Sequence, residues 1–235
     1  MGRVLVFDVW GDYAHYKKYY TTTSPLTFSI PPRTALCGLI GAILGYGKDD
    51  YILPLSKDQV SIAVGLLCPV KKVRLAENLI DTTQSPSSFH KIQERTQIRF
   101  ELLKDPRFRV YFSHCDPSVQ GKLRELLIDH KCIYTPCLGL SEYIAEFKYV
   151  GEYEAAEEQP ERPEYIYSAI PENRILDMVF EEEREYISET MPIDMASDRS
   201  VNEYAAVMFE RNAKPIKARV KSCLHLETGE RIVFL

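Results

Sequence analysis

The chain has 235 residues, 45% of them hydrophobic and 27% charged, so it can bury a core and is not globally disordered. Its formal net charge is −5, yet residues 1–150 hold 19 Lys and Arg against 15 Asp and Glu, whereas residues 151–235 hold 10 against 19. Because salt confines electrostatic attraction to about 10 Å, this acidic total does not exclude a local basic surface that binds nucleic acid.

The chain begins with a short apolar run, Val4–Phe7, which predicts a buried strand. The run reaches Asp8 after four apolar residues, which is too short for the core of a signal peptide or for a membrane span. No later segment approaches the roughly 18 apolar residues that a membrane helix needs. We therefore expect a cytoplasmic protein with no membrane partner.

The next segment, Trp10–Tyr20, is unusually aromatic and basic. Its eleven residues, WGDYAHYKKYY, contain one Trp, four Tyr, one His and two Lys. This composition predicts a loop with side chains suited to stacking and to phosphate contacts.

A helix is predicted after Pro31 and Pro32, because proline is tolerated in the first turn of a helix. Apolar residues then recur at helical spacing, and Gly45 or Gly47 should end the helix. These apolar positions are Leu36, Leu39, Ile40, Ile43 and Leu44.

The middle of the chain is expected to contain a strand at Val60–Cys68 and a hairpin over Gln97–Ser113 that turns at Lys104–Pro106. Between them, Lys71–Thr96 is polar and rich in turn residues. A loop of that length in a compact domain is normally functional or mobile.

A second helix should follow the N-cap Asp116 and Pro117, and a strand should cover Tyr143–Val150. The resulting order of strands and helices predicts an α+β, ferredoxin-like domain over residues 1–150. Residues 152–189 then hold 13 Asp and Glu against 3 Lys and Arg, a basic stretch spans residues 211–221, and a short strand covers 231–235. We assign residues 151–235 to a smaller, β-rich C-terminal domain.

Nothing in the sequence predicts a metal or a cofactor. The six cysteines include no CxxC pair and no cluster with histidine at zinc spacing. The sequence also contains no Walker-type phosphate loop and no GxSxG motif.

Two segments resemble the Cas-five family of the RAMP superfamily, whose ferredoxin-like domain is RRM-like. The run Phe28–Gly45, FSIPPRTALCGLIGAILG, is similar to the opening signature of the family, and Cys137–Tyr143, CLGLSEY, is similar to a stretch that precedes the last strand of the first domain. The resemblance implies a subunit of a type I CRISPR Cascade complex for antiviral defence, of an I-B-like subtype. It would cap the 5′ handle of the CRISPR RNA (crRNA).

The resemblance also implies the partners. A backbone subunit and the large subunit of Cascade would pack against the chain, and target DNA is a further candidate in the assembled complex. In the family a long hairpin called the thumb rises between the second and third strands of the domain and contacts RNA. That position corresponds to residues 71–99 here.

The residues themselves agree with RNA binding, because single-stranded RNA is held by cations on its phosphates and by aromatic rings stacked on its bases. The richest mixtures of these groups lie in Trp10–Tyr20 and in residues 71–99. The candidate RNA-binding residues are Trp10, Tyr13, His15, Tyr16, Lys17, Lys18, Tyr19, Arg33, Lys71, Lys72, Arg74, His90, Lys91, Arg95 and Arg99.

The main alternative is a metal-independent endoribonuclease that processes precursor crRNA, as the I-C members of the family do. Such cleavage needs a base, an acid and a cation for the phosphorane. Tyr46 lies near the position of their catalytic tyrosine. Those members also carry an adjacent lysine and histidine, which have no clear match here. His90–Lys91 has the reverse order, and His15 with Lys17 and Lys18 is the second candidate. We predict no catalytic residue.

A third alternative is a ferredoxin-like protein that binds a small metabolite. This alternative fits the predicted fold but leaves the aromatic, basic loop unexplained.

Overall fold

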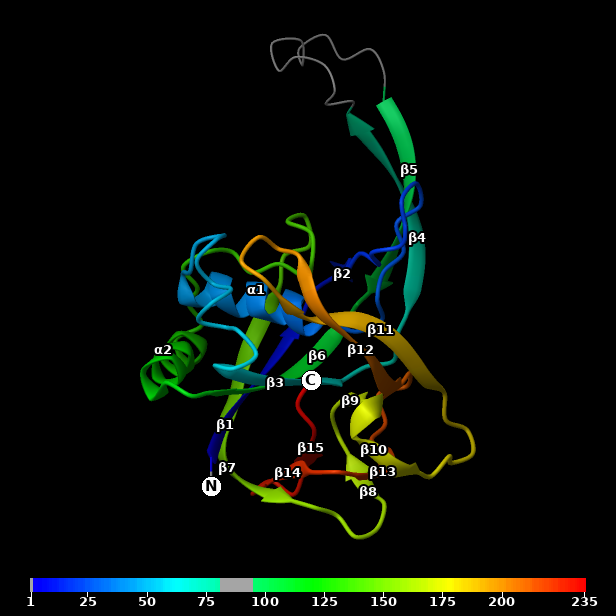
Figure 1. The fold of residues 1–235 in the computed structure, drawn as a ribbon. Coiled ribbons are helices and arrows are strands. Elements are labelled where there is room, and N and C mark those ends of the chain that lie inside the picture. Colours follow the sequence, from blue (N-terminus) through cyan, green and yellow to red (C-terminus); the bar gives the residue numbers. More distant parts are fainter. Residues whose placement is uncertain (1, 81–94) are drawn as a thin grey trace.

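The computed structural model describes residues 2–80 and 95–235. It is a mixed α/β fold with few helices and one large, curled sheet (Figure 1). This sheet has nine strands in the order β10-β13-β8-β15-β14-β7-β1-β6-β3, and two three-stranded sheets are ordered β11-β12-β9 and β2-β5-β4.

The first half of the chain builds the centre of the large sheet. Its elements are β1 (Gly2–Trp10), β2 (Tyr13–Ala14), α1 (Arg33–Leu44), β3 (Val60–Leu66), β4 (Lys72–Ile80), β5 (Arg95–Lys104), β6 (Arg107–His114), α2 (Pro117–Ile128) and β7 (Glu146–Glu158). Strand β1 lies between β6 and β7 and is antiparallel to both, and β3 pairs with the far edge of β6.

Strand β1 is buried on both faces, which explains its continuous apolar sequence. Leu5 and Phe7 join the main core with the apolar residues of α1 and α2, while Val4 and Val6 join a second cluster on the opposite face. The helices α1 and α2 therefore cover the face of the large sheet that carries Leu5 and Phe7.

The end of α1 and the start of α2 lie where the sequence predicts them. The helix α1 ends at Gly45, which has a φ of 82° in the left-handed region that favours glycine. The helix α2 begins after Asp116, whose side chain accepts a hydrogen bond from the backbone N–H of Ser118.

The second half adds strands to the same large sheet. Strand β7 pairs with β1 and also with β14, so the domain boundary predicted between residues 150 and 151 falls within a strand that both segments share. The remaining elements are β8 (Glu164–Ile166), β9 (Ile170–Pro171), the 3₁₀ helix η2 (Glu172–Arg174), β10 (Ile175–Met178), β11 (Tyr186–Met195), β12 (Val201–Glu210), β13 (Ile216–Val220), β14 (Cys223–Leu226) and β15 (Arg231–Ile232).

The β11–β12 pair crosses over α1, as Figure 1 shows. Met191 of β11 and Val207 of β12 are fully buried in the main core together with Ile40 and Ile43 of α1. The helix α1 is therefore enclosed between the large sheet and this small one.

The turn predicted at Lys104–Pro106 forms, but the hairpin predicted around it does not. Asp105 has a φ of 49°, and the strands on either side of it enter different sheets. Strand β5 pairs with β4 and β2, whereas β6 pairs with β1 and β3. The alternating pattern located the strands and the turn but could not choose their partners.

The segment predicted as a long loop contains two strands. Residues 72–80 form β4 and strand β5 begins at Arg95, and the β4–β5 pair projects from the body of the protein (Figure 1). We call this pair the arm. The part of the predicted loop at residues 81–94, which includes His90 and Lys91, lies outside the described residues.

Within the described residues, no helix is long and apolar enough to cross a membrane. All six cysteines are free, and only Cys37 and Cys223 are buried.

Candidate nucleic-acid interface

The aromatic, basic segment Trp10–Tyr20 folds back against its own continuation. Strand β2 pairs with the end of β5, the N–H of Lys18 donates to the carbonyl of Leu26 at 2.9 Å, and the N–H of Phe28 donates to that of Tyr16 at 2.8 Å. These bonds anchor the segment at the base of the arm.

Two of its predicted RNA-binding residues, His15 and Tyr16, are buried. His15 is 1% exposed, and its Nδ1 lies 2.9 Å from the carbonyl oxygen of Glu101 while its ring packs edge-on against Phe100. Tyr16 is 5% exposed and packs against Phe108, and this burial raises the pKa of its hydroxyl. We correct both predictions, because neither ring has a free face for a base.

Arg33 is also a structural residue rather than a surface cation. Its side chain is 2% exposed at the start of α1. The guanidinium donates to three backbone carbonyls, those of Ile193 at 3.2 Å, Leu55 at 3.3 Å and Val60 at 2.8 Å. Arg33 therefore ties the helix to β11 and to the edge strand β3, and it is not placed to contact RNA.

Lys18 and Lys72 meet at one buried carboxylate, that of Glu189 on β11. The Nζ of Lys18 lies 2.8 Å from Glu189 and that of Lys72 lies 3.8 Å away, and the backbone N–H of Ser29 donates to the same carboxylate at 2.7 Å. Burial is the largest single influence and lowers the pKa of Lys18, but the hydrogen bond and charge of Glu189, together with Tyr20, outweigh it and raise this pKa overall. The charge of both lysines is thus partly neutralised within the protein.

Glu189 belongs to the acidic stretch 152–189 but does not face solvent. Its side chain is 9% exposed and holds the base of the arm to β11. Elsewhere in the stretch, Glu154, Glu157, Glu161 and Glu182 are at the surface.

The other predicted residues of the segment remain accessible to different degrees. Trp10 is half-buried beneath the guanidinium of Arg107, which lies 5.3 Å from its ring centroid. Tyr13 is half-buried beside Tyr143, whereas Lys17 and Tyr19 are exposed.

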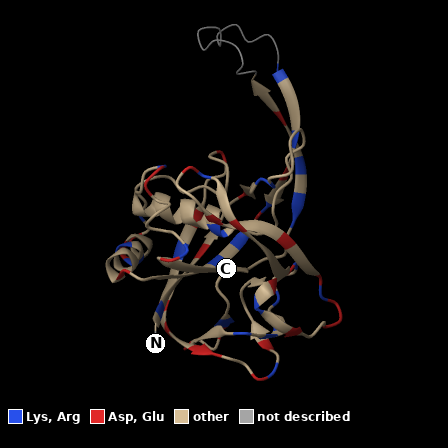
Figure 2. Cartoon of the chain, in the orientation of Figure 1, with Lys and Arg blue, Asp and Glu red and all other residues tan. Residues whose placement is uncertain are grey.

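One face of the arm is cationic. Side chains alternate between the two faces of a strand, and residues directly opposite each other in an antiparallel pair share a face. Ala76 lies opposite Arg99, and Ile80 lies opposite Arg95, so the cations collect on one side. Figure 2 shows basic residues as blue bands along the arm. This cationic face carries Lys72, Arg74, Arg95 and Arg99. The last three are exposed.

The opposite face of the arm is apolar except for Glu77 and Thr96. Leu75 is 40% exposed and Leu79 is 38% exposed, whereas Phe100 packs against His15 at the base. The hydroxyl of Tyr143 donates to Glu77 at 2.8 Å. The arm is therefore amphipathic.

The CLGLSEY stretch, which resembles the Cas-five family, contacts the aromatic, basic segment at this base. The N–H of His15 donates to the carbonyl of Leu138 at 3.0 Å, and the N–H of Leu138 in turn donates to the carbonyl of Tyr143 at 2.7 Å. Gly139 packs directly on the backbone of His15 with a φ of 97°. The CLGLSEY stretch thus supports both the aromatic segment and the arm.

The remaining candidates are dispersed. Lys71 is exposed just before β4, and its carbonyl accepts from the N–H of Lys104 at 2.9 Å. Tyr46, the candidate for the nuclease reaction, is half-buried after α1 with the Nζ of Lys122 6.0 Å from its ring centroid.

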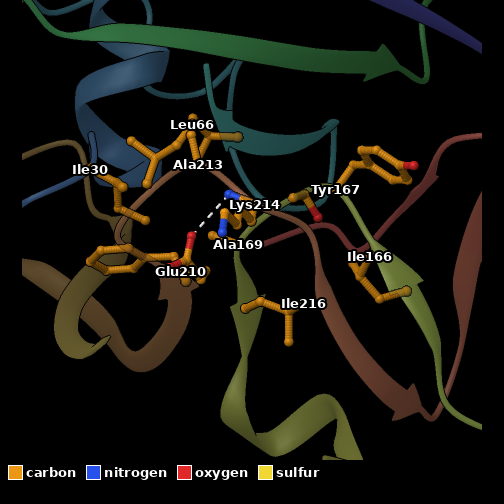
Figure 3. A pocket seen from close by; sticks show the side chains of 12 residues that line it. Ile30, Leu66, Ile166, Tyr167, Ala169, Glu210, Ala213, Lys214 and Ile216 are labelled. Atoms are coloured by element: carbon orange, nitrogen blue, oxygen red, sulfur yellow. Dashed lines mark hydrogen bonds between the residues drawn. The ribbon is translucent and has the colours of Figure 1, made fainter. Parts of the chain in front are cut away.

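The described residues contain no group of His, Cys, Asp and Glu side chains that could hold a metal ion. A cavity of about 20 Å³ beside Glu210 (Figure 3) has room for about one water molecule. Glu210 accepts hydrogen bonds from the backbone N–H groups of Glu185, Asn212 and Lys214 at 2.8–3.0 Å. Its carboxylate is thus a structural acceptor.

Sequence reasoning missed Glu189 and Tyr204. Tyr204 of β12 is 43% exposed, and its ring centroid lies 4.9 Å from that of Tyr19. No local pattern could have revealed the pairing of Tyr204 with Tyr19 or of Glu189 with Lys18, because each joins residues more than 170 positions apart in the chain.

Comparison with known proteins gives the family. Residues 4–210 match the family model described as CRISPR-associated protein (Cas_Cas5). No curated protein sequence matches the chain.

Solved structures share the fold at low sequence identity. A CRISPR protein from Archaeoglobus fulgidus is 12% identical with a TM-score of 0.58, and the match covers 97% of each chain. A chain of a CRISPR RNA-guided surveillance complex is 12% identical with a TM-score of 0.54 over 90% of this chain and 91% of that one. A chain of the Type III-B Cmr-beta complex is 14% identical with a TM-score of 0.53 over 92% and 86%. Because the family model spans most of its length, the chain belongs to the CRISPR-associated Cas5 family.

Proposed function

We propose that the chain is an RNA-binding subunit of a CRISPR effector complex that holds the 5′ handle of crRNA and does not cleave it. The observation that carries this proposal is the continuity of two surfaces. The cationic face of the arm ends at Lys72, and Lys72 meets Lys18 of the aromatic segment at the carboxylate of Glu189.

This continuity suits single-stranded RNA. Arginines along the arm would contact phosphates, and exposed aromatic rings at its base would stack on bases, each stack contributing about 1–3 kcal/mol. The similar fold of one chain in a CRISPR RNA-guided surveillance complex, and of another in a Cmr-beta complex bound to cognate target RNA and AMPPnP, supports the assignment.

The position of the arm in the chain supports its assignment as the family's thumb. The arm rises between β3 and β6 of the β1–α1–β3–β6–α2–β7 series, whose strand order β7-β1-β6-β3 supports the ferredoxin-like assignment of residues 1–150. Its exposed leucines, Leu75 and Leu79, offer an apolar surface to a neighbouring protein. We assign that apolar surface as the contact for the backbone subunit. We assign the exposed acidic residues of 152–189 as the contact for the large subunit.

The alternative, cleavage of precursor crRNA, finds less support. His15 is buried, and its Nδ1 is engaged by the carbonyl of Glu101. Tyr46 lies beside α2, on an element separate from the arm. Losing a positioned acid or base typically lowers a rate by about 10²- to 10⁴-fold.

One experiment addresses both parts of the proposal. Purified protein is incubated in EDTA with precursor repeat RNA, and in competition assays with mature crRNA that contains or lacks the handle. We expect binding that depends on the handle and weakens as the salt concentration increases, and we expect the RNA to remain uncleaved. Equal competition by RNA without the handle would contradict the capping role. Cleavage at the base of the repeat hairpin that is lost in Tyr46→Phe would instead establish the nuclease.

A further inference from the structure

Three exposed tyrosines from two distant segments meet beside the base of the arm. Tyr19 is 58% exposed, Tyr20 is 60% exposed and Tyr204 is 43% exposed. The ring centroids of Tyr19 and Tyr20 are 5.1 Å apart, and those of Tyr19 and Tyr204 are 4.9 Å apart. We call these three residues the tyrosine cluster.

The geometry of the tyrosine cluster leaves ring faces open. Tyr19 and Tyr20 are at 89° to each other, and Tyr19 and Tyr204 are at 54°. The first contact is edge-to-face and the second is tilted, so neither stacks two ring faces together. The remaining exposed faces are available to a planar group from outside.

The two tyrosines of the aromatic segment are held in place before any ligand arrives. They occupy the centre of a turn in which the N–H of Thr21 donates to the carbonyl of Lys18 at 3.2 Å. The side-chain hydroxyl of Thr21 donates to the same carbonyl at 2.8 Å, and the side chain of Lys18 is fixed by Glu189. Such preorganisation reduces the entropy lost on binding.

The charge around the tyrosine cluster favours nucleic acid as the ligand. Lys17 is exposed on the same turn-forming segment, and Lys18 connects the tyrosine cluster through Glu189 to Lys72 and the cationic face of the arm. Phosphates along the arm would bring an adjacent base to the rings. Aromatic side chains beside cations are the usual platform for unpaired bases.

We propose that Tyr19, Tyr20 and Tyr204 form a stacking platform for an unpaired base of the bound RNA. This inference rests on the proposed function and adds Tyr204, on β12, to the RNA-binding surface. The small sheet β11–β12 would then have two roles, since it encloses α1 and completes the platform.

The test uses the full-length protein and single-stranded handle RNA that carries 2-aminopurine at one position at a time. At one of these positions, binding of the wild-type protein should change the 2-aminopurine fluorescence as stacking on an aromatic ring does. Tyr204→Ala should lose this fluorescence signal and about 5- to 150-fold in affinity, which corresponds to the loss of one base stack of about 1–3 kcal/mol. Tyr204→Phe should retain both, because the ring is kept.

Controls separate the platform from the electrostatic part of binding. Tyr134→Ala removes a tyrosine of similar exposure, 53%, and should bind as the wild type does. The slope of log affinity against log salt should be the same for Tyr204→Ala and wild type, because the substitution leaves the cations that face phosphate in place. Tyr19→Ala combined with Tyr204→Ala should cost less than the sum of the single losses if both rings hold the same base.

Two results would overturn the platform while leaving RNA binding intact. One is wild-type affinity and fluorescence in Tyr204→Ala. The other is normal RNA affinity with failed assembly into the complex, which would make the tyrosine cluster a protein-docking surface. Absence of RNA binding by the wild-type protein would overturn the proposed function and the platform together.

Discussion

Gly139 lies against the carbonyl group of His15 so closely that a β carbon at this position would collide with the oxygen. The contact joins the CLGLSEY stretch to the aromatic, basic segment. The φ of 97° at Gly139 adds a second requirement for glycine.

Gly139→Ala should therefore destabilise the protein by about 2 kcal/mol or more, since both the collision and the positive φ oppose it. Urea unfolding measures the change. Gly121→Ala is the matched control, because no atom lies within 4 Å of the β carbon position at this helical glycine. It should stabilise the protein by about 0.5–1 kcal/mol. Equal stability of the two variants would show that the contact with His15 is not maintained in solution.

Glu189→Gln should weaken the fold and strengthen RNA binding. The amide keeps an acceptor for Ser29 but removes the charge that faces Lys18 and Lys72. We expect a loss of about 1–3 kcal/mol in unfolding free energy. Lys18 would become available to a phosphate, so the salt slope of RNA binding should steepen by about 0.7.

Glu185→Gln provides the control for this substitution. It breaks an exposed pair with Arg211 and should leave stability nearly unchanged. Weaker RNA binding by Glu189→Gln in a stably folded protein would contradict the idea that Glu189 restrains these lysines.

Substitution of Arg74, Arg95 and Arg99 by alanine should lower RNA affinity without unfolding the protein, because all three are exposed on the cationic face. Removing one cation from a phosphate of a single strand reduces the salt slope by about 0.7, so the slope of the triple variant should be lower by up to about two. Filter binding at several salt concentrations measures this. Arg162→Ala, at a cation with 85% side-chain exposure in the acidic stretch, should bind normally. An unchanged slope in the triple variant would remove the arm from the RNA site.

Arg33→Ala should destabilise the protein while leaving the RNA affinity of its folded fraction unchanged. The substitution removes the guanidinium donor from three backbone carbonyls, of which that of Leu55 keeps a further side-chain donor, the thiol of Cys37, at a cost of about 3 kcal/mol or more. Arg33→Lys, which keeps the charge but not the planar fork, should recover only part of this. Normal stability combined with weaker RNA binding would restore Arg33 to the RNA-binding set.

Stability should fall as the solution becomes mildly acidic, partly through His15. Burial is the main cause that lowers the pKa of His15 below its ordinary value of 6.5. The unfolded chain therefore binds a proton near pH 6.5 that the folded chain does not, so unfolding is favoured as pH decreases from about 6.5 toward the lowered pKa.

Replacement of His15 by Gln should flatten this part of the pH–stability curve, which urea midpoints at closely spaced pH values would show. His130→Gln, at a histidine with 60% side-chain exposure, is the control and should retain the wild-type slope. A wild-type slope in His15→Gln would assign the effect to other groups.

The sequence by itself determined the first strand, the two helices, the end of α1 and the start of α2. The apolar run at Val4–Phe7 became the central strand β1, and the cap residues Gly45 and Asp116 mark the limits of α1 and α2 as predicted. These features depend on local conformational preference and on the period of apolar residues, both of which can be read along the chain.

Tertiary structure alone decided which polar residues are available to bind. His15, Tyr16 and Arg33 have the composition of an RNA site, yet each is buried by residues distant in sequence. The pairing of β5 with β4 instead of β6, and the approach of Tyr204 to Tyr19, likewise depend on long-range contacts. A residue's type fixes what it can bind, but exposure and charge partners depend on which segments the core brings together, because burial is a property of the whole fold.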